Sequence, residues 1–156
     1  MGKTAMNGVL ALLLAAGLPM APAHAAGGGV TGPQVVAVLA QMDLEPELTT
    51  DSVGDPMVKF RIGGLNAFAN FYDCNAGTCG SLQLEVGIDM PDGVSLQMAN
   101  VLNTRYRYIR VHLDDEMDPF IQYDFEVLHT DPAAHITSQV ELYGGLLEKV
   151  TEAIDF

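Results

Sequence analysis

Both cysteines of the chain lie in the stretch YDCNAGTCGS, where four residues separate Cys74 from Cys79. Thiols at this spacing could form a redox centre, bind a metal ion or join in a structural disulfide. A redox pair is usually spaced C-x-x-C at the start of a helix, where the helix dipole lowers the pKa of the thiol. A zinc site needs about four nitrogen or sulfur ligands at fitting spacings. The cysteine pair matches neither pattern.

The residues around the cysteines favour the disulfide. His112, His129 and His135 are scattered along the chain and form no metal-ligand signature, so we interpret each as a structural or surface histidine. The loop NAGT joins two segments with strand-like alternation, and Asn and Gly are residues that hairpin loops prefer. We therefore expect Cys74 and Cys79 to form a disulfide that fixes the register of two strands and carries out no chemistry.

Acidic residues form the second group with chemical potential. The densest cluster consists of Asp114, Asp115, Glu116 and Asp118. Carboxylates could hold Ca²⁺, which takes about six or more oxygen ligands, but the order and the distal Glu of an EF-hand loop are missing. Asp and Pro are common in solvated turns, so we interpret residues 114–118 and residues 51–55 as turns. The two segments, TDSVGDPMV and LDDEMDPFI, are similar enough to predict two similar turns into strands.

No catalytic constellation stands out in the rest of the chain. There is no Gly-x-Ser-x-Gly motif, and Gly27 to Gly29 lack the Lys and the preceding strand of a phosphate-binding loop. We expect no catalytic residue, no metal and no cofactor. A calcium-dependent or thiol-redox function, through the acidic turn or the cysteine pair, is the alternative to a binding role.

The charged residues bear on possible partners. The chain has 20 Asp and Glu against 7 Lys and Arg, a formal net charge of −13, which argues against nucleic acid as a partner. Arg105, Arg107 and Arg110 lie within six residues and could dock a carboxylate-bearing ligand or partner. The alternative is that they form ion pairs with the acidic turn at residues 114–118.

The N-terminus resembles a secretory signal peptide. Lys3 precedes an apolar run at residues 9–18, and Ala23-His24-Ala25 is a small-x-small cleavage site. We expect cleavage near Ala25, a flexible lead-in at residues 26–32 and one domain at residues 33–156. The location would be periplasmic or secreted, without stable membrane insertion, because no apolar stretch reaches the roughly 20 residues of a span. An uncleaved anchor is the alternative.

The pattern of apolar residues predicts an α+β fold with a mainly antiparallel sheet. A helix begins at Pro33, strands follow at residues 58–62, up to Cys74 and at residues 81–89, and a helix follows the N-cap Ser95. Two strands at residues 109–113 and 120–128 precede a last helix capped by Thr130 or Asp131. The predicted order is therefore helix, about three strands, helix, two strands, helix.

The last helix has a long apolar stripe interrupted by Gly144 and Gly145. Glycine inside a helix costs about 1 kcal/mol, so the pair suggests close packing against a neighbour, which could be another subunit. A local kink is the alternative. We expect Tyr143, Gly144, Gly145 and Leu147 to belong to a partner surface, together with the three arginines.

Residues 34–154 resemble the YbjN-like family of bacterial proteins. The matching pieces are D-x-x-G-D-P at residues 51–56, G-L-N at 64–66, F-Y-D-C…C-G-S-L-Q at 71–83 and A-N-x-L-N-x-x-Y-R at 99–107. The resemblance implies a fold similar to that of type III secretion chaperones, with a curved antiparallel sheet, and often a homodimer. It also implies that Asn100 and Asn103 hydrogen-bond neighbouring backbone.

Members of this family are described as sensory transduction regulators, and the resemblance brings no catalytic residues. Many relatives look cytoplasmic, whereas the N-terminus of this chain resembles a signal peptide. We therefore expect a non-enzymatic periplasmic binding or regulatory module, chaperone-like and homodimeric, with a protein or peptide partner.

Overall fold

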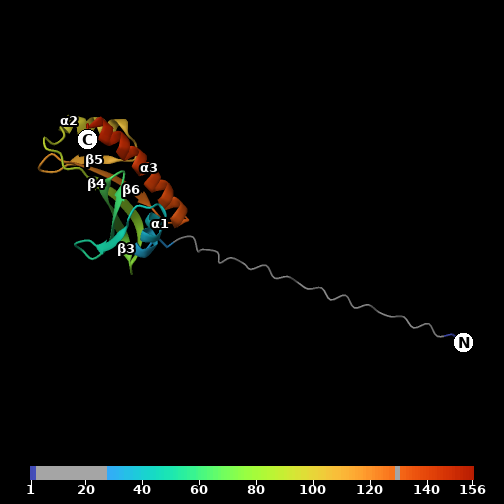
Figure 1. The fold of residues 1–156 in the computed structure, drawn as a ribbon. Helices are drawn as coiled ribbons and strands as arrows, with labels where there is room; N and C mark the ends of the chain where they lie inside the picture. The colour runs from blue at the N-terminus through green and yellow to red at the C-terminus, as the bar shows by residue number, and fades with distance from the viewer. Residues whose placement is uncertain (3–27, 129–130) are drawn as a thin grey trace.

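The computed structural model describes residues 1–2, 28–128 and 131–156. The predicted signal peptide and its cleavage site lie almost wholly outside the described residues, as do His129 and Thr130. The elements are α1 (Gly32–Gln41), β1 (Glu47–Thr50), β2 (Pro56–Ile62), β3 (Leu65–Asn75), β4 (Thr78–Gly87), α2 (Leu96–Arg105), β5 (Arg110–Leu113), β6 (Pro119–Glu126) and α3 (Pro132–Ala153) (Figure 1). The predicted α+β class and order of elements are confirmed, with one further short strand, β1.

The six strands form one antiparallel sheet in the order β1-β2-β3-β4-β6-β5. The first four strands follow one another as neighbours, because tight turns connect them. After β4 the chain passes through α2 and returns as β5 at the edge, and β6 then lies between β5 and β4. The positions of α2 and β5 therefore define one end of the molecule (Figure 1).

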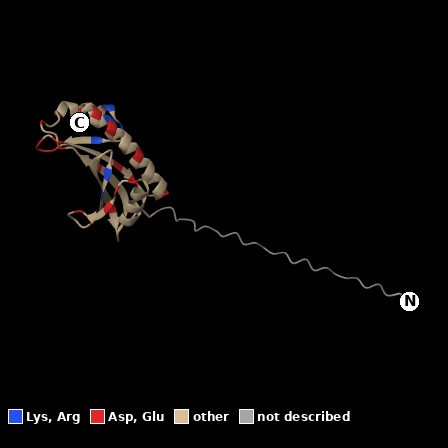
Figure 2. Cartoon of the chain, viewed as in Figure 1, with Lys and Arg blue, Asp and Glu red and all other residues tan. Residues whose placement is uncertain are grey.

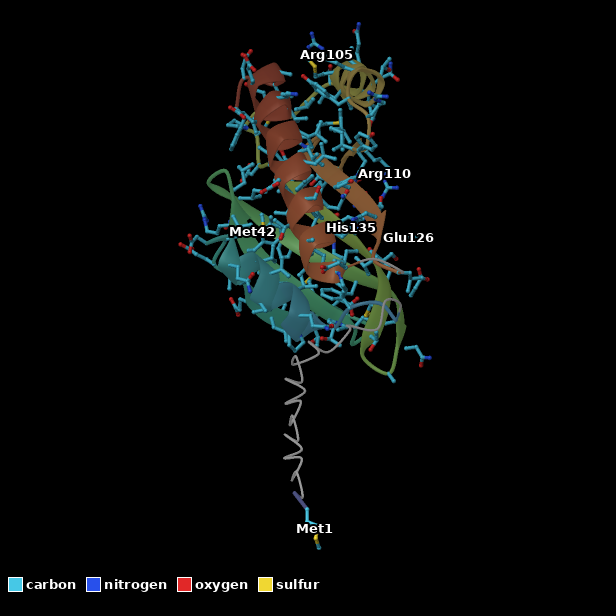
Figure 3. All side chains as sticks on the ribbon, turned by 90° about the vertical axis from the view of Figure 1, so that its right-hand side faces the viewer. Met1, Met42, Arg105, Arg110, Glu126 and His135 are labelled. Carbon is cyan, nitrogen blue, oxygen red and sulfur yellow. A yellow bond between two sulfur atoms is a disulfide. The ribbon has the colours of Figure 1, made fainter. Side chains whose placement is uncertain are left out.

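One face of the sheet packs against helices. In β2, Val58, Phe60 and Ile62 are buried whereas Lys59 and Arg61 are exposed, which is the alternation that the sequence predicts. α3 lies over the buried face, where the Tyr143 hydroxyl donates a hydrogen bond of 2.7 Å to the Ile121 carbonyl oxygen. α1 packs beside α3 and over β2 (Figures 1 and 3).

The apolar stripe of α3 belongs to this core. Tyr143 is 0% exposed and Leu147 is 3% exposed. These two side chains therefore cannot form the partner surface that we expected. A stripe in a sequence shows which face of a helix is apolar, and here the chain's own sheet covers that face.

The two glycines of α3 have different surroundings. A Cβ atom on Gly144 would lie 3.2 Å from Cδ1 of Ile62, so its close neighbour is β2 of the same chain. Gly145 is exposed, and no atom lies within 4 Å of the position that its Cβ would take. Of the predicted pair, Gly144 serves the packing of α3 on the sheet, and Gly145 is free to meet another molecule.

The segment before α1 differs from the flexible lead-in that we expected at residues 26–32. Val30 is 0% exposed, and its backbone exchanges hydrogen bonds of 2.9 and 2.8 Å with Cys79. Gly32 already belongs to α1, whose N-cap is Thr31. The pairing of β4 with β6 ends at Ser81 and Glu126, and Val30 pairs with Cys79 on β4 beyond that point. Val30 therefore extends the sheet, and the ordered domain begins before residue 33.

The end of α2 is tied to β5 by one side chain. The Asn103 amide nitrogen donates to the Val111 carbonyl oxygen at 2.9 Å, and the Val111 amide donates to the Asn103 side-chain oxygen at 2.8 Å. Asn103 thus makes the backbone contact that the family resemblance implies for it. The predicted N-cap of α2 is present too, since the Ser95 hydroxyl accepts a hydrogen bond from the Met98 amide.

The two acidic turns share one geometry, as the similar sequences predict. In each, the first Asp amide bonds the carbonyl oxygen of the fifth residue, at Asp51 with Asp55 and at Asp114 with Asp118. The first carboxylate also accepts backbone N–H groups, three at Asp51 and two at Asp114, all at 2.9 Å. Each turn is therefore closed by its own leading carboxylate.

Candidate functional site

The cysteines lie at the tip of the β3–β4 hairpin. Cys74 and Cys79 face each other in register and are joined by a disulfide. The two residues at the centre of the turn, Ala76 and Gly77, both have positive φ, as tight hairpin turns require. Cys79 is 0% exposed and lies between β3 on one side and the isolated bridge to Val30 on the other. This setting suits a structural link.

Removing the disulfide is expected to lower the free energy of unfolding by roughly 2 kcal/mol. The closed loop is short, and the entropy of the unfolded chain that such a loop removes is correspondingly small. Urea denaturation of the Cys74→Ala/Cys79→Ala variant, compared with the oxidised protein, measures the difference. An unchanged stability, together with insulin reduction that depends on Cys74, would return the pair to redox chemistry.

The acidic turn is arranged for structure. Asp114 binds its own backbone, and Oδ1 of Asp118 accepts the Met90 amide at 2.9 Å, which connects the turn to the loop before α2. Within residues 1–2, 28–128 and 131–156, no group of three or more His, Cys, Asp or Glu side chains is placed to hold a metal ion. No observation in this part of the chain therefore favours the calcium alternative.

The two described histidines have structural neighbours. The His112 ring stacks on Phe120 with centroids 5.2 Å apart. Nε2 of His135 lies 3.0 Å from the Glu126 carbonyl oxygen, which places the start of α3 against the end of β6. Among the hydrogen bonds of the described residues, none joins either ring to a serine or cysteine that it could activate as a nucleophile.

The three arginines do not act as one cluster. Arg110 bonds Gln122 through Nε at 3.0 Å and lies 3.7 Å from an Asp124 oxygen. That pair is the one ion pair of the described residues, so Arg105 and Arg107 do not pair with the acidic turn. The strand β5 separates Arg105 and Arg107 from that turn, although the arginines and the turn are close together in the sequence.

The second face of the sheet is not covered by a helix of the described residues. One register row crosses all six strands on this open face. From β1 to β5 its members are Glu47, Lys59, Phe68, Glu85, Gln122 and Arg110. Glu47, Lys59 and Arg110 are exposed, and the three central residues are half-buried. We call this surface the open sheet face.

A hydrogen-bonded network lies at the centre of the open sheet face. Gln122 links Arg110 to the Glu85 carboxylate, and the Gln83 amide donates to Asp124 at 2.7 Å. Gln83 is only 6% exposed, although its face has no helix over it. Neighbouring side chains therefore hold these polar groups in fixed positions.

Aromatic side chains surround this network. Tyr72, on β3, is 48% exposed, and Phe68 and Phe120 are half-buried on the same face. Burial raises the pKa of Tyr72 above its ordinary value, and the negative charges of Glu85 and Asp124 raise it further. Fixed polar groups beside exposed aromatic rings are the composition of protein-binding surfaces.

Sequence reasoning missed this surface. Tyr72 and Gln83 stand in predicted strands, but we assigned no function to either from the sequence. The signal was available in the density of aromatic and amide side chains at alternate positions of β3, β4 and β6. Only the register, however, shows that Gln83 lies opposite Asp124 and Glu85 opposite Gln122.

Figure 2 shows how the charges are distributed, with Asp and Glu on the turns and along α3 and with Lys and Arg on a few short segments. Within the described residues, no helix combines the length and the apolar character needed to cross a membrane.

A comparison with protein-family models matches residues 33–156, most of the chain, to the family YbjN, described as "Putative bacterial sensory transduction regulator". A comparison with curated proteins found no match.

Proposed function

The chain belongs to the YbjN family, and from this membership we propose that it is a regulatory or binding module that catalyses no reaction. We place it in the periplasm or outside the cell and assign it a chaperone-like capture of a protein or peptide partner. The family description supports a regulator. The location and the mode of action are our proposal.

The open sheet face is the observation that carries the binding role. A sheet needs only one buried face to be stable, so the second face can be given over to recognition. Here that face combines fixed polar groups, Gln83 and Gln122 among them, with the exposed ring of Tyr72. A partner would meet groups that are already ordered, which reduces the entropy lost on binding.

Two features support the location. Residues 1–25 have the order of a signal peptide, with a basic start, an apolar run and a small-x-small site. The disulfide between Cys74 and Cys79 is a bond that persists mainly in oxidising compartments such as the periplasm.

The homodimer remains part of the proposal, on a smaller surface than the sequence suggested. Tyr143 and Leu147 are in the core, but Gly145 is exposed and Leu142, on the same helix, is 39% exposed. An outward patch of α3 that contains a small and an apolar residue lets a second helix approach closely.

Photocrosslinking from the open sheet face tests the function. A photoreactive phenylalanine derivative at Tyr72 is expected to give a covalent adduct of defined mass in periplasmic extracts. The same derivative at Val53, which is 81% exposed on the β1–β2 turn, is the control and is expected to give none. Equal adducts from both positions, or none from Tyr72, would contradict a binding role for this face.

Two measurements on the purified protein complete the test. Intact mass spectrometry of the periplasmic fraction is expected to show a chain that begins at Ala26. Sedimentation equilibrium is expected to give the mass of two such chains. A full-length chain in the cytoplasm would overturn the location, and a monomer at every concentration would overturn the homodimer.

A further inference from the structure

The end of α2 and the segment after it hold two arginines whose charges no ion pair neutralises. Arg105 is the last residue of α2, and both Arg105 and Arg107 are exposed. Among the described residues, no Asp or Glu oxygen lies within 4.0 Å of either guanidinium group. In a chain with 20 acidic residues and 7 basic ones, Arg105 and Arg107 place two unpaired positive charges two positions apart.

Helix electrostatics account for only part of this arrangement. Arg105 is in the last turn of α2, where a positive charge interacts with the helix dipole for about 0.3–1 kcal/mol. Arg107 lies beyond the helix, so the dipole gives no reason for its position. The Asp114 carboxylate accepts backbone N–H groups of its own turn, and the Asp118 carboxylate accepts the Met90 amide, so both already have partners.

Each arginine stands beside a tyrosine ring. The guanidinium carbon of Arg105 is 5.9 Å from the centroid of the Tyr106 ring, and that of Arg107 is 6.0 Å from the centroid of the Tyr108 ring. The rings limit the motion of the guanidinium groups without satisfying their N–H donors. We call residues 105–108 the arginine–tyrosine surface; Arg105 marks its place at the end of the molecule in Figure 3.

The backbone holds this surface in one conformation. Tyr106 donates from its hydroxyl to the Lys149 carbonyl oxygen at 3.4 Å, which ties the segment to α3. The Tyr108 side chain is 63% exposed. The φ of Tyr108 is +77°, in the left-handed region, which costs a large residue about 1–3 kcal/mol. Its ring meets Tyr123 edge-on at 6.4 Å. The fold therefore keeps a large aromatic ring at the surface in an unfavourable backbone conformation.

These features define the chemistry of a partner. Guanidinium forks bind carboxylates through two parallel hydrogen bonds, and Tyr and Arg are the residues that most often dominate protein interfaces. Val101, one turn before Arg105 on α2, is 43% exposed and adds an apolar contact. The formal charge of −13 repels a long polyanion or an anionic membrane, whereas a short acidic peptide meets mainly the local positive charge.

We propose that the arginine–tyrosine surface binds an acidic segment of a separate polypeptide, with carboxylates on Arg105 and Arg107 and an apolar residue between Val101 and Tyr108. The inference rests on the proposed binding function and names the class of partner. Arg110 is not part of this surface, because Gln122 and Asp124 hold it on the open sheet face.

Fluorescence anisotropy with a labelled synthetic peptide tests the proposal. The probe alternates four Glu with Leu, Tyr and Leu, and a second probe has Gln in place of every Glu. The full mature protein is expected to bind the Glu probe, more weakly as salt increases, and not the Gln probe. The Arg105→Gln/Arg107→Gln variant is expected to bind roughly tenfold to a hundredfold more weakly, as lost charge-assisted bonds imply.

Ser52→Glu/Val53→Glu is the matched control, because it changes the net charge by the same two units on the exposed β1–β2 turn, outside both proposed surfaces. It is expected to keep the affinity within about twofold, which is the range that screened, distant charges produce. Arg105→Lys/Arg107→Lys is expected to bind with intermediate affinity, since lysine keeps the charge but not the fork. Equal binding of both probes, or equal weakening by Ser52→Glu/Val53→Glu, would overturn the proposal.

Two further measurements test whether another molecule occupies the arginine–tyrosine surface instead of an acidic polypeptide. Binding to phosphatidylglycerol vesicles in place of the Glu probe would overturn the polypeptide partner. Self-association that the Arg105→Gln/Arg107→Gln change abolishes would make a second copy the occupant and would overturn it too. Photocrosslinking from Tyr72 reports on the open sheet face, so it can succeed when the Glu probe fails, and the two proposals can fail separately.

Discussion

Replacing Tyr143 by alanine is expected to lower the free energy of unfolding by about 4 kcal/mol, which is typical of a large aromatic residue removed from a core. The side chain is 0% exposed, and its ring lies nearly parallel to that of Tyr123, with centroids 6.2 Å apart. Truncation would leave a cavity between α3 and the sheet. Burial raises the pKa of Tyr143 above its ordinary value, so the buried hydroxyl remains the donor of its hydrogen bond at neutral pH.

Two variants divide this loss into its parts. Tyr143→Phe keeps the ring but removes the hydrogen bond to the Ile121 carbonyl oxygen, and it is expected to cost about 1–2 kcal/mol. Leu142→Ala, at the next residue, removes a side chain that is 39% exposed and is expected to cost less than about 1 kcal/mol. Urea denaturation measures the free energy of unfolding of Tyr143→Ala, Tyr143→Phe and Leu142→Ala. A Tyr143→Ala variant as stable as Leu142→Ala would return Tyr143 to the partner surface.

Replacing Gly29 by alanine is expected to lower the free energy of unfolding by about 3 kcal/mol, near the upper end of the usual range for one substitution. Its φ is +87°, and a Cβ atom there would lie 2.2 Å from the Cys79 carbonyl oxygen. The segment would have to move away from β4, which breaks the two hydrogen bonds between Val30 and Cys79. Exposing the Val30 side chain alone would cost about 1.5–3 kcal/mol.

Gly54→Ala is the control for the backbone conformation. Its φ is +96°, but no atom lies within 4 Å of the Cβ position, so only the left-handed conformation of the backbone is penalised, by about 1–2 kcal/mol. Hydrogen exchange at the Val30 and Cys79 amides is expected to accelerate in the Gly29 variant alone. If both variants lose the same free energy of unfolding, the collision with Cys79 adds no cost. The pairing of Val30 with Cys79 then does not contribute to stability.

Alternation and turn residues were sufficient to predict much of the fold. The strands on either side of Cys74 and Cys79, the N-cap at Ser95 and the two related acidic turns all depend on local spacing. β1 was missed because the sequence ELTT of Glu47–Thr50 has no apolar alternation. A strand at the edge of a sheet is determined mainly by its neighbour, which local sequence does not reveal.

The candidate site could be predicted only in part, because a site depends on what lies opposite each residue. Nearness in sequence suggested ion pairs between the arginines and residues 114–118 as the alternative to a docking role, but the described residues contain no such pair. The stripe through Tyr143 was correctly assigned to a helix, but its partner is the chain's own sheet. The open sheet face depends on cross-strand pairs such as Gln83 with Asp124, which no single segment contains.

The contact between Asn103 and Val111 has a consequence for the ageing of the protein. The side-chain amide occupies both backbone groups of an edge strand, as an additional strand would, and so prevents another chain from pairing there. Deamidation of Asn103 would replace the amide donor with a carboxylate oxygen, which repels the Val111 carbonyl. One chemical event at one side chain would then expose a template for fibrillar aggregation, two residues before Arg105 of the arginine–tyrosine surface.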